Sequence, residues 1–520
     1  PAFDATTEPI ARSKQGMVVG TCAQRTKTRP SLSLAVIVSG LANGWVSPYL
    51  AQLTSTDADV PLRLTNAEAS WVASLLSLGR VVGALLGAVC QEYLGRKKVL
   101  LIGGLPLASS WVFNICATSV TWLYISRFFS GIGSGIIWPA LTLYLGEIAD
   151  PKIRGSLVNL RCYYVILDII ILKIRNSKRN RSDYLAYPPF FIITISHIFD
   201  IPRQVCVMFL ISLNVNATSI GMFLGNAIGP YLPMEMFGYV SLVPNILFMV
   251  LFSMIPESPY HYVLHGDIDR AEESLKWFRR EADVKAELTE LQEFVGGAGT
   301  NIFEKLKEFL LPANLKTAFM ILGLYAFAYA SGYNIVNSYA EIIVTKCGID
   351  LTPNIVVTSL GVATIVAGFT STLVVDRFGR KCLLMVSGFG VTIALLLLGL
   401  HFHLISLGLD PRDFTWLPIT ALLMFNLFLS YGLLPVPNAL LGEMFPANLK
   451  NLASLCVSSS NALMSFGYLK GYQPFTDLFG DKFVFWTYGL LVFFSVPYVY
   501  FLIPETKGKS LLEVQRAIKR

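Results

Sequence analysis

The chain has 520 residues, of which 54% are hydrophobic and only 14% are charged. Soluble globular domains carry roughly 25% charged residues, so this composition favours a membrane protein over a water-soluble globule. The formal net charge of +7 requires no nucleic-acid partner, because Lys and Arg gather in the cytoplasmic loops of membrane proteins. The natural partner of such a chain is the lipid bilayer.

Residues 1–30 are polar, and the first apolar run is Leu32–Leu50. This run is longer than the core of a signal peptide, so we interpret it as a spanning helix. Pro1 in place of Met suggests that the N-terminus is incomplete. The eight cysteines are scattered and have no spacing typical of a zinc site or a disulfide framework, so we expect no metal and no cofactor.

Windows of about 20 apolar residues predict twelve spanning helices, which makes the chain an all-α membrane protein. Pairs of small residues, such as Gly83/Gly87 and Gly131/Gly135, favour close helix contacts. The predicted spans are 32–53, 69–92, 99–118, 122–145, 213–232, 237–256, 317–345, 353–377, 382–404, 415–441, 449–470 and 482–504.

The sequence contains an internal repeat. Gly95-Arg96-Lys97 is matched by Gly379-Arg380-Lys381, and the acid and base of Glu147–Arg154 are matched by Glu443–Lys450. Each repeated motif ends or follows an apolar run, which indicates two related six-helix bundles. The positive-inside rule places all of these basic segments, and both termini, in the cytoplasm. We therefore predict a multi-pass protein, most simply of the plasma membrane.

The repeat also predicts the domain organisation. Two amphipathic helices, Asp267–Arg280 and Val284–Phe294, are expected in a cytoplasmic linker beneath the bundles. The predicted parts are a tail at 1–30, an N-terminal bundle at 31–256, the linker at 257–312, a C-terminal bundle at 313–504 and a tail at 505–520.

One stretch interrupts the symmetry. Glu147 and Glu257 are 110 positions apart, whereas Glu443 and Glu505 are 62 apart, so the first half carries 110 − 62 = 48 extra residues. The excess falls in 161–212, which is basic and contains two short apolar patches. We interpret it as a cytoplasmic insertion, either untranslated sequence retained in a gene model or a pair of additional helices.

Several motifs together resemble the sugar porters of the major facilitator superfamily, and in particular the insect branch that includes facilitated trehalose transporters. The resemblance covers about 31–508 apart from the insertion. The motifs that carry it are Glu92…Gly95-Arg96-Lys97-Lys98, Arg127, Tyr144…Glu147…Arg154-Gly155, Pro256-Glu257-Ser258-Pro259, Ser331-Gly332-Tyr333-Asn334, Asp376-Arg377-Phe378-Gly379-Arg380-Lys381, Glu443-Met444-Phe445-Pro446 and Pro504-Glu505-Thr506-Lys507-Gly508.

The resemblance implies two six-helix bundles with a substrate held between them near the midplane. It also implies charged residues at the cytoplasmic helix ends, where ion pairs between the bundles form in one state and break in the other. The residues expected in this role are Glu147, Arg154, Arg96, Asp376, Arg380, Glu443, Lys450, Glu257 and Glu505.

A neutral sugar offers hydroxyl groups, so its site is expected to contain amides, hydroxyls and aromatic faces rather than charges. Ser331, Asn334 and Asn337 follow one another at intervals of three in the predicted seventh helix, so they are expected close to one face of it. Asn334 and Asn461 match the sugar-contacting asparagines of the family, and Asn438 occupies a position where many relatives have Trp. Each of these asparagines can instead serve hydrogen bonding between helices.

Two departures bear on the substrate. The Gln pair that usually precedes Ser-Gly in helix seven is Ala328-Tyr329 here, and Arg80 lies in the middle of the second span. An intramembrane Arg is costly and is usually paired or functional. The run Leu32–Leu50 contains no Asp, Glu or His, the groups that a proton symporter needs, so facilitated movement is favoured.

The sequence therefore predicts a facilitative uniporter of a sugar such as trehalose or glucose, working by alternating access. A carrier of another small polar or organic-ion solute, and a non-transporting sensor or inactive paralogue, are the alternatives. No catalytic constellation and no phosphate-binding loop is present, so we do not expect an enzyme.

Overall fold

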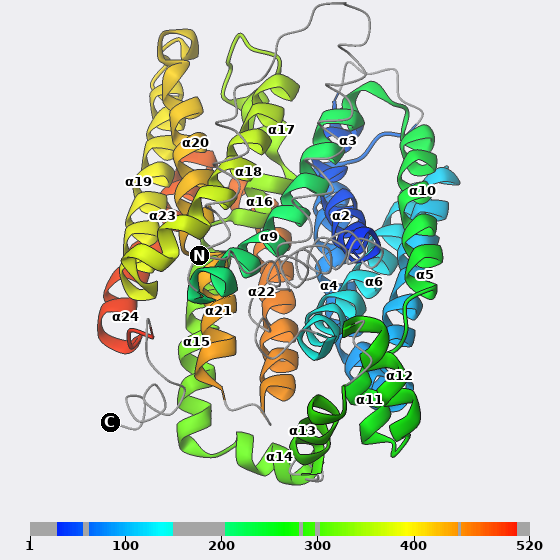
Figure 1. The fold of residues 1–520 in the computed structure, drawn as a ribbon. Helices are drawn as coiled ribbons and strands as arrows, with labels where there is room; N and C mark the ends of the chain where they lie inside the picture. The colour runs from blue at the N-terminus through cyan, green and yellow to red at the C-terminus, as the bar shows by residue number, and fades with distance from the viewer. Residues whose placement is uncertain are drawn as a thin grey trace, which may run out of the picture.

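The structure is a computed structural model that describes residues 29–55, 62–148, 203–279, 284–296, 302–445 and 449–506. Within these ranges the regular structure is helical throughout (Figure 1). The helices of the N-terminal half are α2 (Arg29–Gly44), α3 (Val46–Thr54), α4 (Asn66–Leu94), α5 (Arg96–Ile115), α6 (Val120–Ile148), α9 (Arg203–Ile228), η2 (Gly229–Tyr231) and α10 (Met234–Ser253).

A set of short helices joins the two halves, and a second group of spans follows. The linker contains α11 (Pro259–Leu264), α12 (Ile268–Arg279), α13 (Lys285–Gly296) and α14 (Ile302–Phe309). The C-terminal half contains α15 (Pro312–Ala330), α16 (Tyr333–Ser338), α17 (Ala340–Lys346), α18 (Pro353–Phe378), α19 (Arg380–Ser406), η3 (Pro411–Phe414), α20 (Trp416–Tyr431), α21 (Pro435–Met444), α22 (Lys450–Phe479), α23 (Asp481–Phe493) and α24 (Ser495–Leu502).

Each of the twelve predicted spans coincides with one helix or with a run of consecutive helices. Nine segments of the described chain are long and apolar enough to cross a membrane, which confirms the membrane reading of the composition. Four predicted spans are not continuous: the first, seventh, tenth and twelfth are each divided.

The seventh span is divided where the sequence predicted a single helix over 317–345. Gly332 has φ +74°, a left-handed conformation that an α-helix does not continue through, so α15 ends at Ala330 and α16 begins at Tyr333. A second break lies at Tyr339, between α16 and α17. The break at Gly332 separates Ser331 from the helical turn that carries Asn334. This corrects the expectation that Ser331, Asn334 and Asn337 lie close to one face of a single helix.

Close approach between α4 and α6 depends on glycine, as the sequence predicted. A Cβ atom added at Gly131 would lie 2.2 Å from the carbonyl oxygen of Leu76 and 2.8 Å from the Cα of Gly79. The two helices therefore pack backbone against backbone, which fixes the position of α4 within the N-terminal half.

The linker helices α11–α14 lie together at one end of the bundle, and α3 and α17 lie at the opposite end (Figure 1). The first three pack around a small apolar cluster of their own, made by Val263, Ala271, Leu275, Val284 and Leu288. The two predicted amphipathic helices are confirmed as α12 and α13, whereas α11 and α14 were not anticipated.

The predicted insertion is described only in part. Helix α9 begins at Arg203, ten residues before the predicted start of the fifth span, so the segment 203–212 belongs to a helix. The remainder of the insertion, Arg154 and most of both predicted tails lie outside the described residues.

Candidate functional site

Polar side chains meet between the two halves in the middle of the bundle. The Nδ2 of Asn334, on α16, donates to the Oγ of Ser465, on α22, at 2.6 Å. The Oγ of Ser465 lies 2.7 Å from the Oγ of Ser77, on α4 of the other half. This chain of three groups, Asn334–Ser465–Ser77, is the polar bridge, and it joins the halves through side-chain hydrogen bonds. Of its members, the sequence singled out only Asn334.

Arg80 lies one turn along α4 from Ser77. Its Nη2 donates to the Oδ1 of Asn43, on α2, at 3.3 Å, while its Nε is buried without a hydrogen-bond partner. Tyr329 and Tyr333, in the C-terminal half, lie near the guanidinium. The charge therefore faces the region between the halves rather than lipid.

The other predicted sugar-contacting residues have different surroundings. Ser331 is fully buried and its hydroxyl donates to the carbonyl of Ala328, while the amide of Asn337 donates to the carbonyl of Tyr333. Asn461 is partly buried, and its Oδ1 has no hydrogen-bond partner in the described part of the chain. Of these three residues, Asn461 therefore retains a buried acceptor for a ligand.

Asn438, on α21, accepts a hydrogen bond from the hydroxyl of Tyr325 on α15 at 2.6 Å, and its Nδ2 donates to the carbonyl of Leu434. Both ends of the amide are occupied, so the arrangement favours a contact that holds α21 against α15.

We expect Tyr325→Phe to lower the free energy of unfolding by about 1 kcal/mol, because one hydrogen bond is lost, and to leave the KM for any transported solute unchanged. Asn438→Ala should behave in the same way if the amide only joins the helices. Thermal melts in detergent and uptake kinetics of both variants measure this. A raised KM in Asn438→Ala alone would instead place Asn438 in the substrate site.

Two of the predicted gating residues occupy equivalent positions in the two halves. The Oε1 of Glu257 accepts a hydrogen bond from the backbone N–H of Lys97 at 2.8 Å, at the start of α5. Glu505 accepts from the backbone N–H groups of Arg380 and Lys381, both at 3.1 Å, at the start of α19. Each carboxylate thus binds the positive end of a helix dipole within its own half.

The glycine before each helix makes room for that carboxylate. Gly95 and Gly379 both have φ +86°, and a Cβ on them would lie 2.6 Å and 2.9 Å from an Oε2 of Glu257 and Glu505. This repeated carboxylate cap is the structural form of the repeat seen in the sequence. Ion pairing of these glutamates between the halves stays a prediction.

The remaining predicted gating residues are less fully described. Arg96 is buried and its Nη1 donates to the carbonyl of Gln91 at 2.8 Å. The backbones of Glu147, Asp376, Glu443 and Lys450 lie at helix ends, but their side chains are outside the described part of the structure.

The halves also meet at the end that carries α3 and α17. The Oγ of Ser47 accepts a hydrogen bond from the backbone N–H of Glu341 at 3.1 Å. The Nζ of Lys470 lies 2.9 Å from the Oγ of Ser70 and 4.0 Å from the centre of the Trp71 ring. These contacts close this end of the interface, which is remote from Gly95 and Gly379, and the sequence had not marked them.

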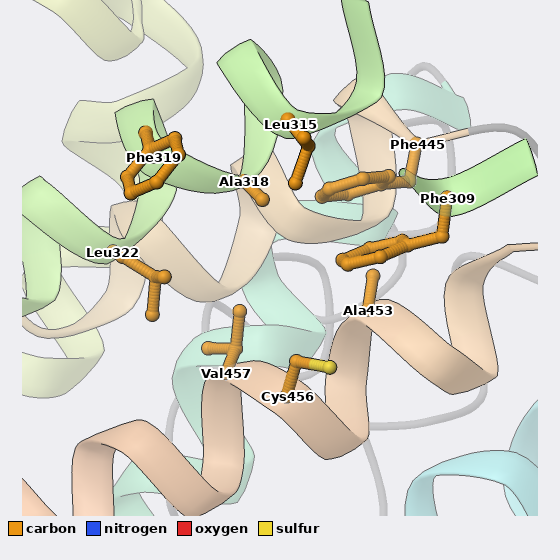
Figure 2. Close-up of a pocket in the computed structure, with 9 residues that line it drawn as sticks. All are labelled: Phe309, Leu315, Ala318, Phe319, Leu322, Phe445, Ala453, Cys456 and Val457. Carbon is orange, nitrogen blue, oxygen red and sulfur yellow. The ribbon is translucent and has the colours of Figure 1, made fainter. Parts of the chain in front are cut away.

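A pocket lies within the C-terminal half, between α15 and α22 (Figure 2). Its lining offers no hydroxyl, amide or charged group, so it cannot satisfy the hydroxyls of a sugar. The lining residues are Phe309, Leu315, Ala318, Phe319, Leu322, Phe445, Ala453, Cys456 and Val457. We assign it to packing rather than to substrate.

No group of three or more His, Cys, Asp or Glu side chains suited to a metal ion occurs in the ranges that the structure describes.

A family model described as "Sugar (and other) transporter" matches residues 32–184 and 202–518. Facilitated trehalose transporters from Drosophila virilis and Aedes aegypti are 30% and 28% identical to this chain over 94% of its length. These matches cover 48% and 54% of the two relatives, so the chain spans about half the length of the curated relatives it matches. A facilitated trehalose transporter from Culex quinquefasciatus is 28% identical, over 98% of this chain and 87% of that one.

Solved structures with the same fold include the proton:xylose symporter XylE bound to a bromodeoxyglucose, with a TM-score of 0.66, 19% identity and coverage of 95% of this chain and 99% of that one. A partially occluded inward-open form of the xylose transporter XylE from E. coli has a TM-score of 0.68 at 19% identity, over 94% of this chain and 99% of that one. These likenesses confirm the predicted major facilitator fold of two six-helix bundles.

Proposed function

This chain belongs to the family of sugar and other transporters, and from that premise we propose that it is a facilitative carrier of a sugar such as trehalose or glucose. The observation that carries the proposal is the polar bridge, which brings one amide and two hydroxyl groups together between the halves. Such groups exchange hydrogen bonds with sugar hydroxyls at little electrostatic cost.

Alternating access gives this bridge a role in transport. Ser77 belongs to one half, and Asn334 and Ser465 belong to the other. A sugar that bonds to both sides replaces the direct contact between Ser77 and Ser465, and so favours a different relative position of the halves. Contacts at the cytoplasmic helix ends, including the predicted ion pairs of Glu147, Glu443 and their basic partners, would then stabilise the outward-facing state.

We propose that transport is driven by the sugar gradient alone. The candidate first span, Leu34–Thr54, contains no Asp, Glu or His, and Asn43 is the polar side chain that faces Arg80. A proton-coupled carrier needs a titratable group near its substrate, and neither the polar bridge nor Asn43 provides one.

We expect oocytes expressing the chain to take up radiolabelled trehalose or glucose with saturable kinetics, and a protonophore to leave the initial rate unchanged. Uninjected oocytes are the control. A rate that collapses with the proton gradient would contradict uniport while leaving sugar transport in place.

The alternatives give other results in the same assay. Uptake of an organic ion without sugar uptake would favour a carrier of another solute, and sugar binding without flux would favour a sensor or inactive paralogue.

We further propose a plasma-membrane location with both termini in the cytoplasm, since the basic segments around Gly95 and Gly379 lie at one end of the bundle. Antibody access to terminal tags in intact and permeabilised cells tests this orientation.

A further inference from the structure

The two membrane-embedded arginines of the N-terminal half are satisfied to different extents. Arg127 is buried, and its Nε and Nη1 donate to the carbonyls of Val72 and Ala42 at 3.0 Å and 2.6 Å, with its guanidinium 5.5 Å from the centre of the Trp45 ring. This is the way a structural arginine joins helices. Arg80 has only the 3.3 Å bond to Asn43, and its buried Nε has no partner.

The hydrogen bonds of Asn43 orient its amide oxygen toward Arg80, but this oxygen does not neutralise the positive charge of the guanidinium. The Nδ2 of Asn43 donates to the carbonyl of Ser39 at 2.7 Å, so its Oδ1 is the atom that faces the guanidinium. An amide oxygen is neutral, and within the described residues Arg80 makes no ion pair. The nearby positive charge of Arg127 adds repulsion, because the two guanidinium groups interact electrostatically.

Arg80 is only partly buried, but its Nε is shielded from solvent and has no partner. Pairing an intramembrane guanidinium with an anion lowers the cost of keeping its charge there. Arg80 lies one turn from Ser77 of the polar bridge and near Tyr329 and Tyr333 of the opposite half, so the missing anion belongs in the region between the halves. A transported solute enters this region during each transport cycle.

We propose that the central site takes a sugar that bears one carboxylate, such as a hexuronate, with the carboxylate on Arg80 and the hydroxyls on the polar bridge. This inference rests on the proposed sugar-carrier function and names the substrate class of the same site. A carboxylate matches the planar fork of a guanidinium and accepts two parallel hydrogen bonds from it.

The charge balance favours one negative charge. Arg127 already donates to two carbonyls, so Arg80 is the cation left to pair with the solute. A phosphate ester near neutral pH carries up to two negative charges and would leave one of them unpaired in this region. A monocarboxylate leaves none.

The test uses the full chain reconstituted in liposomes, with radiolabelled glucuronate and glucose as probes. We expect saturable uptake of glucuronate, with an initial rate that rises when potassium and valinomycin make the lumen positive, because each complete turnover moves one negative charge into the lumen. Glucose uptake should not respond to the potential. Arg80→Gln should lower glucuronate uptake about tenfold or more while lowering glucose uptake less than about twofold.

Two further variants keep the result interpretable. Arg80→Lys retains the positive charge and should retain part of the glucuronate uptake. Comparison of the two variants shows whether the loss of uptake in Arg80→Gln comes from the lost charge or from impaired folding. Lys346→Gln removes a cation that pairs with Asp481 at an exposed site, and it should leave the ratio of the two rates unchanged.

Glucose uptake without glucuronate uptake or competition overturns the inference and leaves the proposed sugar carrier intact. Equal losses of both rates in Arg80→Gln also overturn it, since Arg80 would then serve the structure and not the anion. Absence of flux for both probes removes the proposed function and the inference with it.

Discussion

Replacing Asn334 with alanine will lower the initial rate of sugar uptake about tenfold or more, without changing the amount of protein at the cell surface. The amide of Asn334 donates to Ser465, which in turn lies in hydrogen-bonding distance of Ser77 in the other half. Its removal takes away a group able to bond to a sugar hydroxyl, and leaves the remaining hydroxyls less well ordered. Loss of hydrogen bonds to a bound hydroxyl is costly, which supports a loss of this size.

A matched asparagine provides the control for this result. Asn354, at the start of α18, accepts a hydrogen bond from Thr358 on the same helix and lies outside the polar bridge. Asn354→Ala should leave uptake within about twofold of the parent, since its contact is local. Radiolabelled uptake and surface biotinylation measure both variants. Unchanged uptake in Asn334→Ala would remove Asn334 from the substrate site.

Gly95→Ala and Gly379→Ala will each lower the free energy of unfolding by about 2 kcal/mol or more. Both glycines have φ +86°, with ψ 168° and 163°, a region of backbone conformation that only glycine occupies readily. The added methyl group would also press on the carboxylate of Glu257 or Glu505 and weaken the cap on α5 or α19. Thermal melts of the purified variants measure the loss.

Gly471→Ala supplies the comparison, because this glycine lies inside α22 and a Cβ there meets no atom within 4 Å. Alanine favours a helix by up to about 1 kcal/mol relative to glycine, so the variant should match or exceed the stability of the parent. A loss in Gly471→Ala as large as that in Gly95→Ala would refute the carboxylate cap as the cause.

The helices and their order could be predicted from the sequence, because long apolar runs are a strong signal when the solvent is lipid. The breaks could not. Gly332 stands between Ser331 and Tyr333 in a sequence that is equally compatible with a continuous helix, and only its left-handed φ in the folded chain ends α15. Glycine inside a spanning helix is ordinarily tolerated, so its presence does not predict a break.

The candidate site was predicted in part. Asn334 could be found because an amide in a spanning helix is uncommon and matches a family motif. Ser77 and Ser465 could not, since serines occur throughout these helices and 388 positions separate the two in the chain. The glutamates of the repeat were predicted as charged partners between the bundles. The contacts described for Glu257 and Glu505 are with backbone N–H groups. Matching acidic with basic side chains in the sequence does not predict such contacts, because every residue except proline carries a backbone N–H.

The carboxylate cap has a mechanical consequence for the carrier. In each half it fastens the segment that follows the sixth span to the first turn of the third span, so these parts cannot separate without exposing a buried helix end. Tyr144 adds a further tie in the N-terminal half through its bond to the carbonyl of Pro256 at 2.7 Å. Bending inside a half is therefore opposed, and displacement is directed to the boundary between the halves, where the second and fifth spans, α4 and α9, pack against α22 and α18 of the opposite bundle.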